Sequence, residues 1–349
     1  MKIKILILAL ILGSCAPTIK DFNKYQKQFI SQTEFMPSEE NLEGKPPKVV
    51  VFEFDEANID TAKQADLGNT ISKTVEATLS KNRLAEIVDR KSAAKLQKEV
   101  QLAEMHKTGA YKGPRVADYA ISGGIANADY ASKYSSGSTY INPKNGQLIS
   151  IPPKYTYTSN VSGNIKIFEL PSLQVVETIE MKGKSVRSEN VQTDGGFSLG
   201  GIKIGGEDVA GVQRDDGMVR KAGEDAVDEA SVDIQNFFAK KGYILEKRAH
   251  DKKSIFKINI GSADGIKHGD KFEVIGQYET QNAISGKTEI ERRIIAKGRV
   301  SQLIDPKNCW IVLDEKDQEN AVRIGDMVKI KYTKSILKSA MKMANNAIQ

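Results

Sequence analysis

The chain is poor in the residue types from which metal centres and nucleophilic active sites are built. Its 349 residues include only three histidines, His106, His250 and His268, and these are scattered without a second ligand at metal spacing. No Ser-His-Asp set, G-x-S-x-G motif or H-E-x-x-H motif occurs in the sequence. The acidic residues mostly have a Lys four residues away, as on the solvated face of a helix. We therefore expect no enzyme activity, no metal and no cofactor.

Cysteine is rarer still, with Cys15 and Cys309 as the only two. Cys309 opens the apolar stretch Cys309–Leu313, which predicts a buried core residue. If Cys15 is linked to lipid, no internal disulfide can form. The sequence also lacks clusters of Lys and Arg interleaved with aromatic residues, which a nucleic-acid groove requires, and its formal net charge is only +6. We expect no nucleic-acid partner.

A long apolar run is missing as well, but a short one occupies the N-terminus. Lys2 and Lys4 precede the run Ile5–Leu12, which is shorter than the roughly 20 residues of a membrane-spanning helix. A Leu-Gly-Ser-Cys lipobox then ends at Cys15. This order predicts a signal peptide, residues 1–14, and a mature chain whose first residue carries a diacylglycerol and a further acyl chain such as palmitate. A hydrophobic leader with an incidental cysteine is the alternative.

The next part of the sequence alternates between strand and helix patterns. Residues 15–47 are polar with little periodicity, which predicts a lipidated tether. Leu67, Ile71, Val75 and Leu79 then recur every four residues, the spacing of one helix face. We predict an α+β fold with a mixed α/β core domain over residues 48–248. Its expected elements, in chain order, are Val49–Phe54, the helix through Leu67 and Leu79, Ala85–Asp89, a helix over 94–103, Ala117–Ala126, Val161–Leu170, Val175–Met181 and the helix Ala222–Lys241.

The first of two long insertions covers residues 127–160 and is rich in Tyr, Ser and Thr. Asn145-Gly146 near its middle is a strong hairpin signal. Each arm has about 12 residues, and a membrane-spanning strand needs roughly 9 to 11. A flexible surface insertion is the alternative, because serines dilute the apolar face and Pro152-Pro153 interrupts a ladder. The candidate membrane-facing residues of this hairpin are Tyr130, Tyr134, Tyr140, Ile149, Ile151, Tyr155 and Tyr157.

The second insertion, residues 184–221, contains the glycine-rich run Gly195–Gly206. A phosphate-binding loop would need a strand before this run and a helix opening on it, and neither pattern is present. As a second membrane hairpin, it would have a short apolar tip between polar flanks. A mobile glycine loop is the alternative. The candidate membrane-facing residues of the tip are Phe197, Leu199, Ile202 and Ile204.

Taken in order, these features resemble the CsgG family, which forms the curli-secretion channel of the bacterial outer membrane. The resemblance covers about residues 45–248 and is carried by the lipobox, Val49–Phe54, Ile87–Arg90, Ala117–Ala126 and Asn164–Leu170. In that family the two insertions are transmembrane hairpins, which the subunits pool into one barrel above a periplasmic ring.

The resemblance implies an outer-membrane lipoprotein that faces the periplasm and is held in the membrane by lipid on Cys15. It also implies a homo-oligomeric ring or pore for polypeptide secretion or transport, with secreted or periplasmic protein partners. The family's channel is narrowed by a loop bearing Tyr and Phe, whereas Asp55–Asn69 contains no aromatic residue, so a narrow aromatic gate is not implied. The alternative function is a periplasmic scaffold or activator without a pore, as in peptidoglycan synthase activators and FlgT-type flagellar accessory proteins.

A second domain is expected over residues 249–334. Gly265–Val274 and Ala321–Ile330 each contain a Gly-Asp turn followed by an alternating strand. Together with further strands at Ile255–Ile260, Ile294–Leu303 and Cys309–Leu313, they predict a small β-barrel. This barrel resembles the SH3-like domain at the C-terminus of FlgT-type proteins. Residues 335–349 form a basic tail.

Overall fold

The computed structural model describes residues 16–334, with gaps at 40–41, 43, 82, 90–116, 191–196, 200–201, 205–214, 252, 282 and 284–285. It divides the chain into two compact units. Of the described residues, the α/β unit comprises those within 46–238 with Thr333 and Lys334, and the barrel unit comprises those within 16–45 and 239–332. The parts of the prediction outside the described residues are the expected signal peptide, Cys15, the helix expected over 94–103, the basic tail, and residues 191–196, 200–201 and 205–214 of the second insertion.

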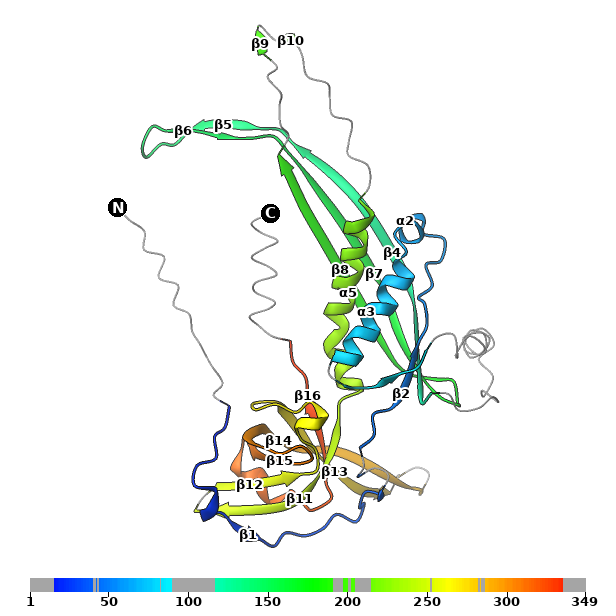
Figure 1. Ribbon diagram of the computed structural model, residues 1–349, viewed down its shortest axis with the longest axis vertical. Coiled ribbons are helices and arrows are strands. Elements are labelled where there is room, and N and C mark those ends of the chain that lie inside the picture. The colour runs from blue at the N-terminus through cyan, green and yellow to red at the C-terminus, as the bar shows by residue number, and fades with distance from the viewer. Residues whose placement is uncertain are drawn as a thin grey trace. The chain divides into compact units, whose positions relative to one another are not determined.

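A five-stranded mixed sheet forms the centre of the α/β unit (Figure 1). The strand order is β3-β2-β4-β7-β8, with β2 parallel to β3 and β4, and with β7 antiparallel to β4 and β8. Strand β2 is fully buried along Val49, Val50 and Val51, which explains its continuous apolar sequence. The strand bounds are β2 Lys48–Val51, β3 Glu86–Ile87, β4 Tyr119–Ser135, β7 Lys154–Glu169 and β8 Gln174–Asn190.

Helices cover one face of this sheet (Figure 1). They are α2 (Asp60–Gln64), α3 (Leu67–Lys81) and α5 (Asp216–Phe237). The four apolar residues predicted to share one face of α3 are all buried, so that prediction is confirmed. Helix α5 begins earlier than expected because Asp215 caps it, accepting hydrogen bonds from the N–H groups of Gly217 and Met218.

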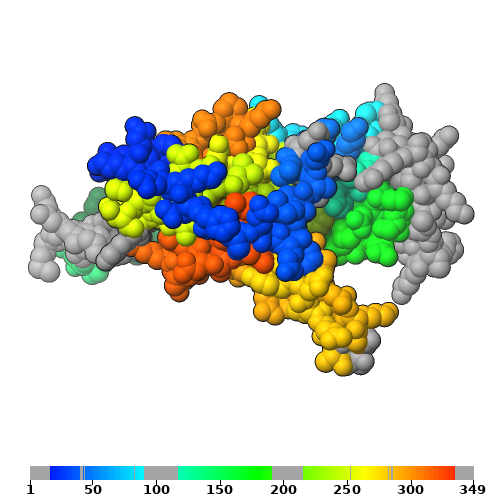
Figure 2. All heavy atoms as spheres, turned by 90° about the horizontal axis from the view of Figure 1, so that it is seen from below, coloured from blue at the N-terminus to red at the C-terminus, as the bar shows by residue number. Residues whose placement is uncertain are grey.

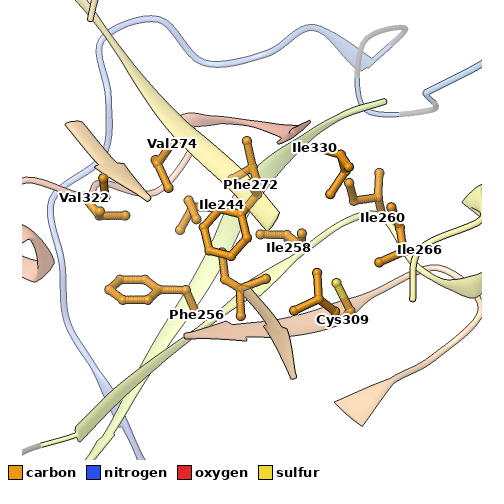
Figure 3. Packing of buried hydrophobic residues seen from close by; sticks show 14 residues of the cluster. Ile244, Phe256, Ile258, Ile260, Ile266, Phe272, Val274, Cys309, Val322 and Ile330 are labelled. Atoms are coloured by element: carbon orange, nitrogen blue, oxygen red, sulfur yellow. The ribbon is translucent and has the colours of Figure 1, made fainter. Parts of the chain in front are cut away.

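The barrel unit is built on six antiparallel strands that close on themselves. The order is β11-β12-β15-β14-β13-β16, and β16 pairs back onto β11. Alternate side chains point inward and form one apolar core that includes Phe256, Phe272 and Cys309 (Figure 3). The strand bounds are β11 Lys241–His250, β12 Lys253–Ile258, β13 Lys271–Gln281, β14 Thr288–Ile304, β15 Cys309–Leu313 and β16 Met327–Lys331, and short 3-10 turns lie at η2 Ser262–Asp264 and η3 Lys316–Asn320.

The boundary between the units falls after Phe238, ten residues before the predicted one at residue 248. The expected helix Ala222–Lys241 ends at Phe237 instead, and β11 follows almost directly. Strand β11 belongs to the barrel because it pairs with both β12 and β16, and because Ile244 points into the barrel core. Without this strand, the barrel has no closing partner for β16.

The predicted tether is also different in the structure. Its first part, residues 16–39, packs on the barrel, and we call it the N-terminal strap (dark blue in Figure 2). Turn η1 (Phe22–Lys24) leads into strand β1 (Gln26–Gln28), which pairs with β11, and Gln32 bridges to Ile324. The strap stays on the barrel because it contributes buried apolar residues as well as backbone hydrogen bonds, which a free polar tether does not.

Gly183 allows β8 to lie directly against α5. A Cβ atom at this position would stand 2.1 Å from the carbonyl oxygen of Ala222 and 2.3 Å from the nitrogen of Ala226. We therefore expect Gly183→Ala to lower the free energy of unfolding by about 2 kcal/mol, because overpacking forces the helix backbone away from the sheet. The matched control is Gly124→Ala, whose Cβ would meet nothing closer than 3.9 Å. Urea denaturation of both variants tests this, and equal stability would contradict it.

Cys309 gives a second test of the barrel core. Burial, together with the charges of Asp270 and Asp264, raises the pKa of its thiol to about 12. The thiol therefore stays protonated and enclosed at neutral pH, and protonated thiols are poor nucleophiles. In a Cys15→Ala chain, we expect no reaction with Ellman's reagent at pH 8 in the native state and one equivalent after denaturation. Prompt reaction of the native chain would show that the barrel is open at β15.

Candidate functional site

Strands β4 and β7 continue well past the end of the helices and form a long hairpin (Figure 1). They pair without interruption from Asn127↔Ser162 to Ser135↔Lys154. Two short strands, β5 (Ser138–Ile141) and β6 (Leu148–Ile151), carry the hairpin further. We call the part between residues 127 and 160 the first extension.

The register of the first extension is the same on both sides of the break between β4 and β5. Tyr134 faces Tyr155, and six residues further along each arm Tyr140 faces Ile149. Pro152-Pro153 lies at this break, where no ladder hydrogen bond is lost. The tip is a turn closed by the Asn142 N–H bonded to the carbonyl of Gln147, with Gly146 at a φ of 66°.

Four tyrosines line one face of the first extension, and we call them the tyrosine ladder: Tyr130, Tyr134, Tyr155 and Tyr157. Their rings contact in sequence, with centroid distances of 6.2 Å between Tyr130 and Tyr157, 6.1 Å between Tyr157 and Tyr155, and 5.1 Å between Tyr155 and Tyr134. Tyr157 is fully buried, Tyr130 and Tyr155 on either side of it are half-buried, and Tyr134 at the outer end is 53% exposed. The inner end of the ladder is therefore packed, and the outer end is open.

Arg187 of β8 closes the inner end of the ladder. Its guanidinium lies 5.5 Å from the ring centroid of Tyr157, its Nη1 is 2.6 Å from Oδ2 of Asp215, and its Nε is 3.0 Å from Oε1 of Glu189. Because Asp215 caps α5, this ion pair joins the end of β8 to the start of α5. The pair thus closes the base of the second insertion. Two charged residues of β8 lie on the same sheet face as the tyrosines, because Arg187 pairs with Tyr157 and Glu189 pairs with Tyr155.

The structure separates the predicted membrane-facing residues of the first extension into two groups. Tyr134, Tyr140 and Ile151 are exposed, and Ile149 lies beside them on β6. Tyr130 and Tyr155 are half-buried, and Tyr157 is fully buried. Alternation alone placed Tyr157 on an exposed face, but Arg187 on the neighbouring strand and the other ladder rings cover it.

Two exposed residues at the hairpin tip were missed by the sequence prediction. Ile141 and Leu148 face each other across β5 and β6, and they are 64% and 66% exposed. They lie on the face opposite Tyr140 and Ile149, so the tip is apolar on both faces. Their position on either side of the Asn145-Gly146 turn was the signal that could have identified them.

The second insertion is described at its tip and at its two ends, which belong to β8 and α5. Strands β9 (Phe197–Leu199) and β10 (Ile202–Ile204) pair antiparallel. This pairing sets Phe197 opposite Ile204 and Leu199 opposite Ile202, so the four predicted membrane-facing residues of this insertion are cross-strand partners.

The loop after β2 borders a shallow cleft of about 490 Å³. Charges of both signs line it, including Glu53, Asp55, Lys63 and Lys166. Asp55 is fixed by backbone hydrogen bonds to Gly123 and Ile125 of β4. The aromatic residue in the lining, Phe54, is buried. The described part of this loop therefore presents a polar surface.

Among the described residues, no group of three or more His, Cys, Asp and Glu side chains is arranged to hold a metal ion. No helix in the same part of the chain is both long and apolar enough to cross a membrane.

Comparisons with known proteins leave the family open. No protein-family model matches the chain, and no curated protein matches it. Among solved structures, a dodecamer of a PelC variant from Paraburkholderia phytofirmans is similar at 12% sequence identity and a TM-score of 0.21, over 48% of this chain and 82% of that one. A TM-score this low assigns neither a fold family nor a function.

Proposed function

We propose that this chain is a lipid-anchored outer-membrane protein of the CsgG type, whose sheet extensions cross the bilayer and pool into a ring-shaped pore for polypeptide export. The observation that carries the proposal is the first extension, a single hairpin that leaves the helix-covered sheet and ends in an apolar tip. Its length, its exposed residues and its open edges each support this function.

The length of the first extension matches the thickness of a bilayer. From Tyr130 to Ile141 the rising arm measures on the order of 40 Å at about 3.4 Å per residue. Strands of membrane barrels tilt by roughly 35° to 45°, which reduces this span to about 30 Å along the membrane normal. The hydrocarbon core of a bilayer is about 30 Å thick. On this span Arg187, which is level with Ser132, lies near one membrane surface, and Glu189, which is level with Tyr134, lies further into the bilayer.

The outer part of the extension exposes several large apolar side chains among its polar residues. Large contiguous exposed apolar surfaces mark interfaces with lipid or protein. Here the exposed residues belong to both arms and to both faces of the tip, which suits insertion of the tip across lipid. They are Tyr134, Tyr140, Ile141, Leu148 and Ile151.

The sheet edges suit a ring. Strand β2 ends at Val51, so no described strand pairs with the outer edge of β4 after Ile125. The outer edge of β8 likewise pairs with no described strand. Open edges on opposite sides of one sheet are complementary, and repeated head-to-tail pairing through them closes into a ring when the rotation allows.

The barrel unit is assigned a docking role in this proposal. We infer that it is an SH3-like module for secreted or periplasmic protein partners, on the strength of its closed antiparallel strands and the Gly-Asp turns at Gly269 and Gly325, both with positive φ. The barrel adds nothing to the bilayer span itself.

One observation favours the second candidate function, a periplasmic scaffold or activator without a pore. Arg187 and Glu189 share a face with the tyrosine ladder. A basic residue on the lipid face costs roughly 2 to 4 kcal/mol at the bilayer midplane. If the whole extension lay in lipid, Arg187 would incur that cost, whereas a solvated hairpin that contacts cell-wall enzymes or the flagellar basal body would not.

Arginine substitutions in the outer part of the first extension distinguish these functions. Tyr134→Arg and Ile151→Arg each place charge where the midplane is expected, and a cost of roughly 2 to 4 kcal/mol at every copy in the ring should stop insertion. Ser132→Arg is the control, because it lies nearer the interface, where the cost is roughly 0 to 1 kcal/mol. The measurement is the yield of membrane-assembled oligomer after detergent extraction.

Cys15→Ala combined with alkaline carbonate extraction completes the comparison. A pore subunit stays in the membrane without its lipid, and a tethered scaffold is released. If the three arginine variants assemble and extract like the parent chain, the pore is excluded. A strictly monomeric particle in detergent would also exclude it.

A further inference from the structure

The N-terminal strap begins directly on the barrel. The Cβ atom of Ala16 lies 3.0 Å from where a Cβ of Gly269 would be. Nε2 of His268 lies 3.1 Å from the carbonyl oxygen of Pro17. At the first residues of the described chain, the backbone is therefore already held against the turn that precedes β13.

Ile19 fastens this start to the barrel wall. Gln302 of β14 bonds both sides of its backbone, accepting from the Ile19 N–H at 2.9 Å and donating to the Ile19 carbonyl at 2.6 Å. The Ile19 side chain is buried in a small cluster with Tyr25, Ile255 and Trp310. A side-chain amide that satisfies both backbone groups, together with burial of the apolar side chain, fixes the strand of chain in position and direction.

A second set of contacts continues the attachment. The ring of Phe22 packs edge-on against Trp310 with centroids 5.1 Å apart, and the Arg248 guanidinium lies 5.0 Å and 5.2 Å from these two ring centroids. The strap is thus held along its length, and not at one point. Residue 16 is therefore attached to the barrel directly and not through a flexible linker.

This attachment determines where the acylated residue emerges. Cys15 is the residue next to Ala16, and adjacent Cα atoms are about 3.8 Å apart. If Cys15 carries lipid, its acyl chains start within one residue of the turn at Gly269. No length of chain remains to separate the barrel from the headgroups, so this end of the barrel must lie at the membrane surface.

The barrel surface beside that turn carries a cross-strand row of basic residues, which we call the basic row: Lys331, Lys271 and Arg299. Lys271 lies opposite Arg299 on one side and Lys331 on the other, so the three side chains share a face. That face is the outside, because neighbouring Phe272 points into the core. The row adjoins the turn, since the Gly269 N–H donates to the carbonyl of Val300, the residue next to Arg299.

The acidic residues near the row do not neutralise this end. Glu273 and Asp314 lie further along the strands, at 3.9 Å from Lys331 and 3.8 Å from Arg299, distances of weak ion pairs. In the turn itself, the Asp270 carboxylate accepts a hydrogen bond from the N–H of Lys267. The Lys267 side chain is exposed, which adds to the positive potential at the anchor.

We propose that the barrel docks on anionic lipid headgroups through Lys267 and the basic row, in an orientation set by the strap. The inference rests on the lipid anchor of the proposed function and is independent of whether the extensions form a pore. Phospholipid headgroups are the occupant favoured by the geometry, because no tether separates the lipid anchor from the barrel surface that carries the basic row. Basic residues at such a surface each strengthen binding by about five-fold and act within a Debye length.

The test uses the full mature chain with Cys15→Ser, so that no lipid anchor contributes, and flotation with phosphatidylcholine vesicles or equimolar phosphatidylcholine and phosphatidylglycerol vesicles. We expect binding that needs phosphatidylglycerol and is released by high salt. Lys271→Gln with Lys331→Gln should weaken it about 25-fold, at about five-fold per charge. The matched control, Lys253→Gln with Lys287→Gln, removes two exposed charges, one at the start of β12 and one at the far end of the β13–β14 hairpin, and should leave binding within about two-fold.

Equal binding to both kinds of vesicle, or equal loss in the two double variants, would overturn the inference. Thermal unfolding of both variants should match the parent chain, because all three exposed lysines and the half-exposed Lys331 lie outside the core. Salt-resistant binding to both vesicle types would also overturn the inference, because such binding does not depend on the charge of the headgroup. The intact mass of the wild-type mature chain shows whether Cys15 is acylated, so a failure of the anchor is distinguishable from a failure of the basic row.

Discussion

The continuous pairing of β4 with β7 is the constraint on which the rest of the α/β unit depends. At its inner end the pair supplies buried residues such as Ile121 and Ile167 to the core under the helices, and at its outer end the same ladder becomes the first extension. A register shift between Ile125 and Asn127 marks the transition. Since one residue of slip exchanges the two faces of a strand, this bulge decides that the tyrosines continue the helix-covered face.

That choice of face explains the arrangement around Arg187. The helix-covered face needs apolar residues where α5 packs, and Gly183 admits the helix backbone to the sheet there. Beyond the start of α5, no helix of the described residues covers the same face. The tyrosine ladder fills this region, and Arg187 bonds the Asp215 cap while lying against Tyr157. The ion pair between Arg187 and Asp215 therefore lies at the boundary between the helix-packed part of the sheet and the first extension.

In the barrel unit, closure depends on two segments from outside the predicted domain. Strand β11 completes the ring of hydrogen bonds, which leaves no exposed edge between β16 and β12. The N-terminal strap then covers Ile255 and Trp310 on the outer surface. For function, this means that a lipid attached at residue 15 would hold the barrel itself at the membrane, because the strap that follows is packed on the barrel wall.

Local patterns determined much of this architecture by themselves. The four-residue spacing from Leu67 to Leu79 fixed the buried face of α3, because a helix brings such residues onto one side regardless of context. The Asn145-Gly146 turn located the hairpin tip, because few other residues accept the positive φ found at Gly146. The alternation in β7 likewise identified a half-buried strand. These features depend on residues that are close together in the sequence, so they can be predicted from the sequence alone.

Only the tertiary structure decided which chain segments meet. Tyr157 has the same alternation as the exposed Tyr134, but it is buried because β8 sets Arg187 beside it. Residues 16–39 have no strand or helix pattern, yet they pack on the barrel because Gln302 and Trp310, near the other end of the chain, provide partners. Lys271, Arg299 and Lys331 form a row only through cross-strand register. Such contacts depend on long-range pairing, for which periodicity along a single segment carries no signal.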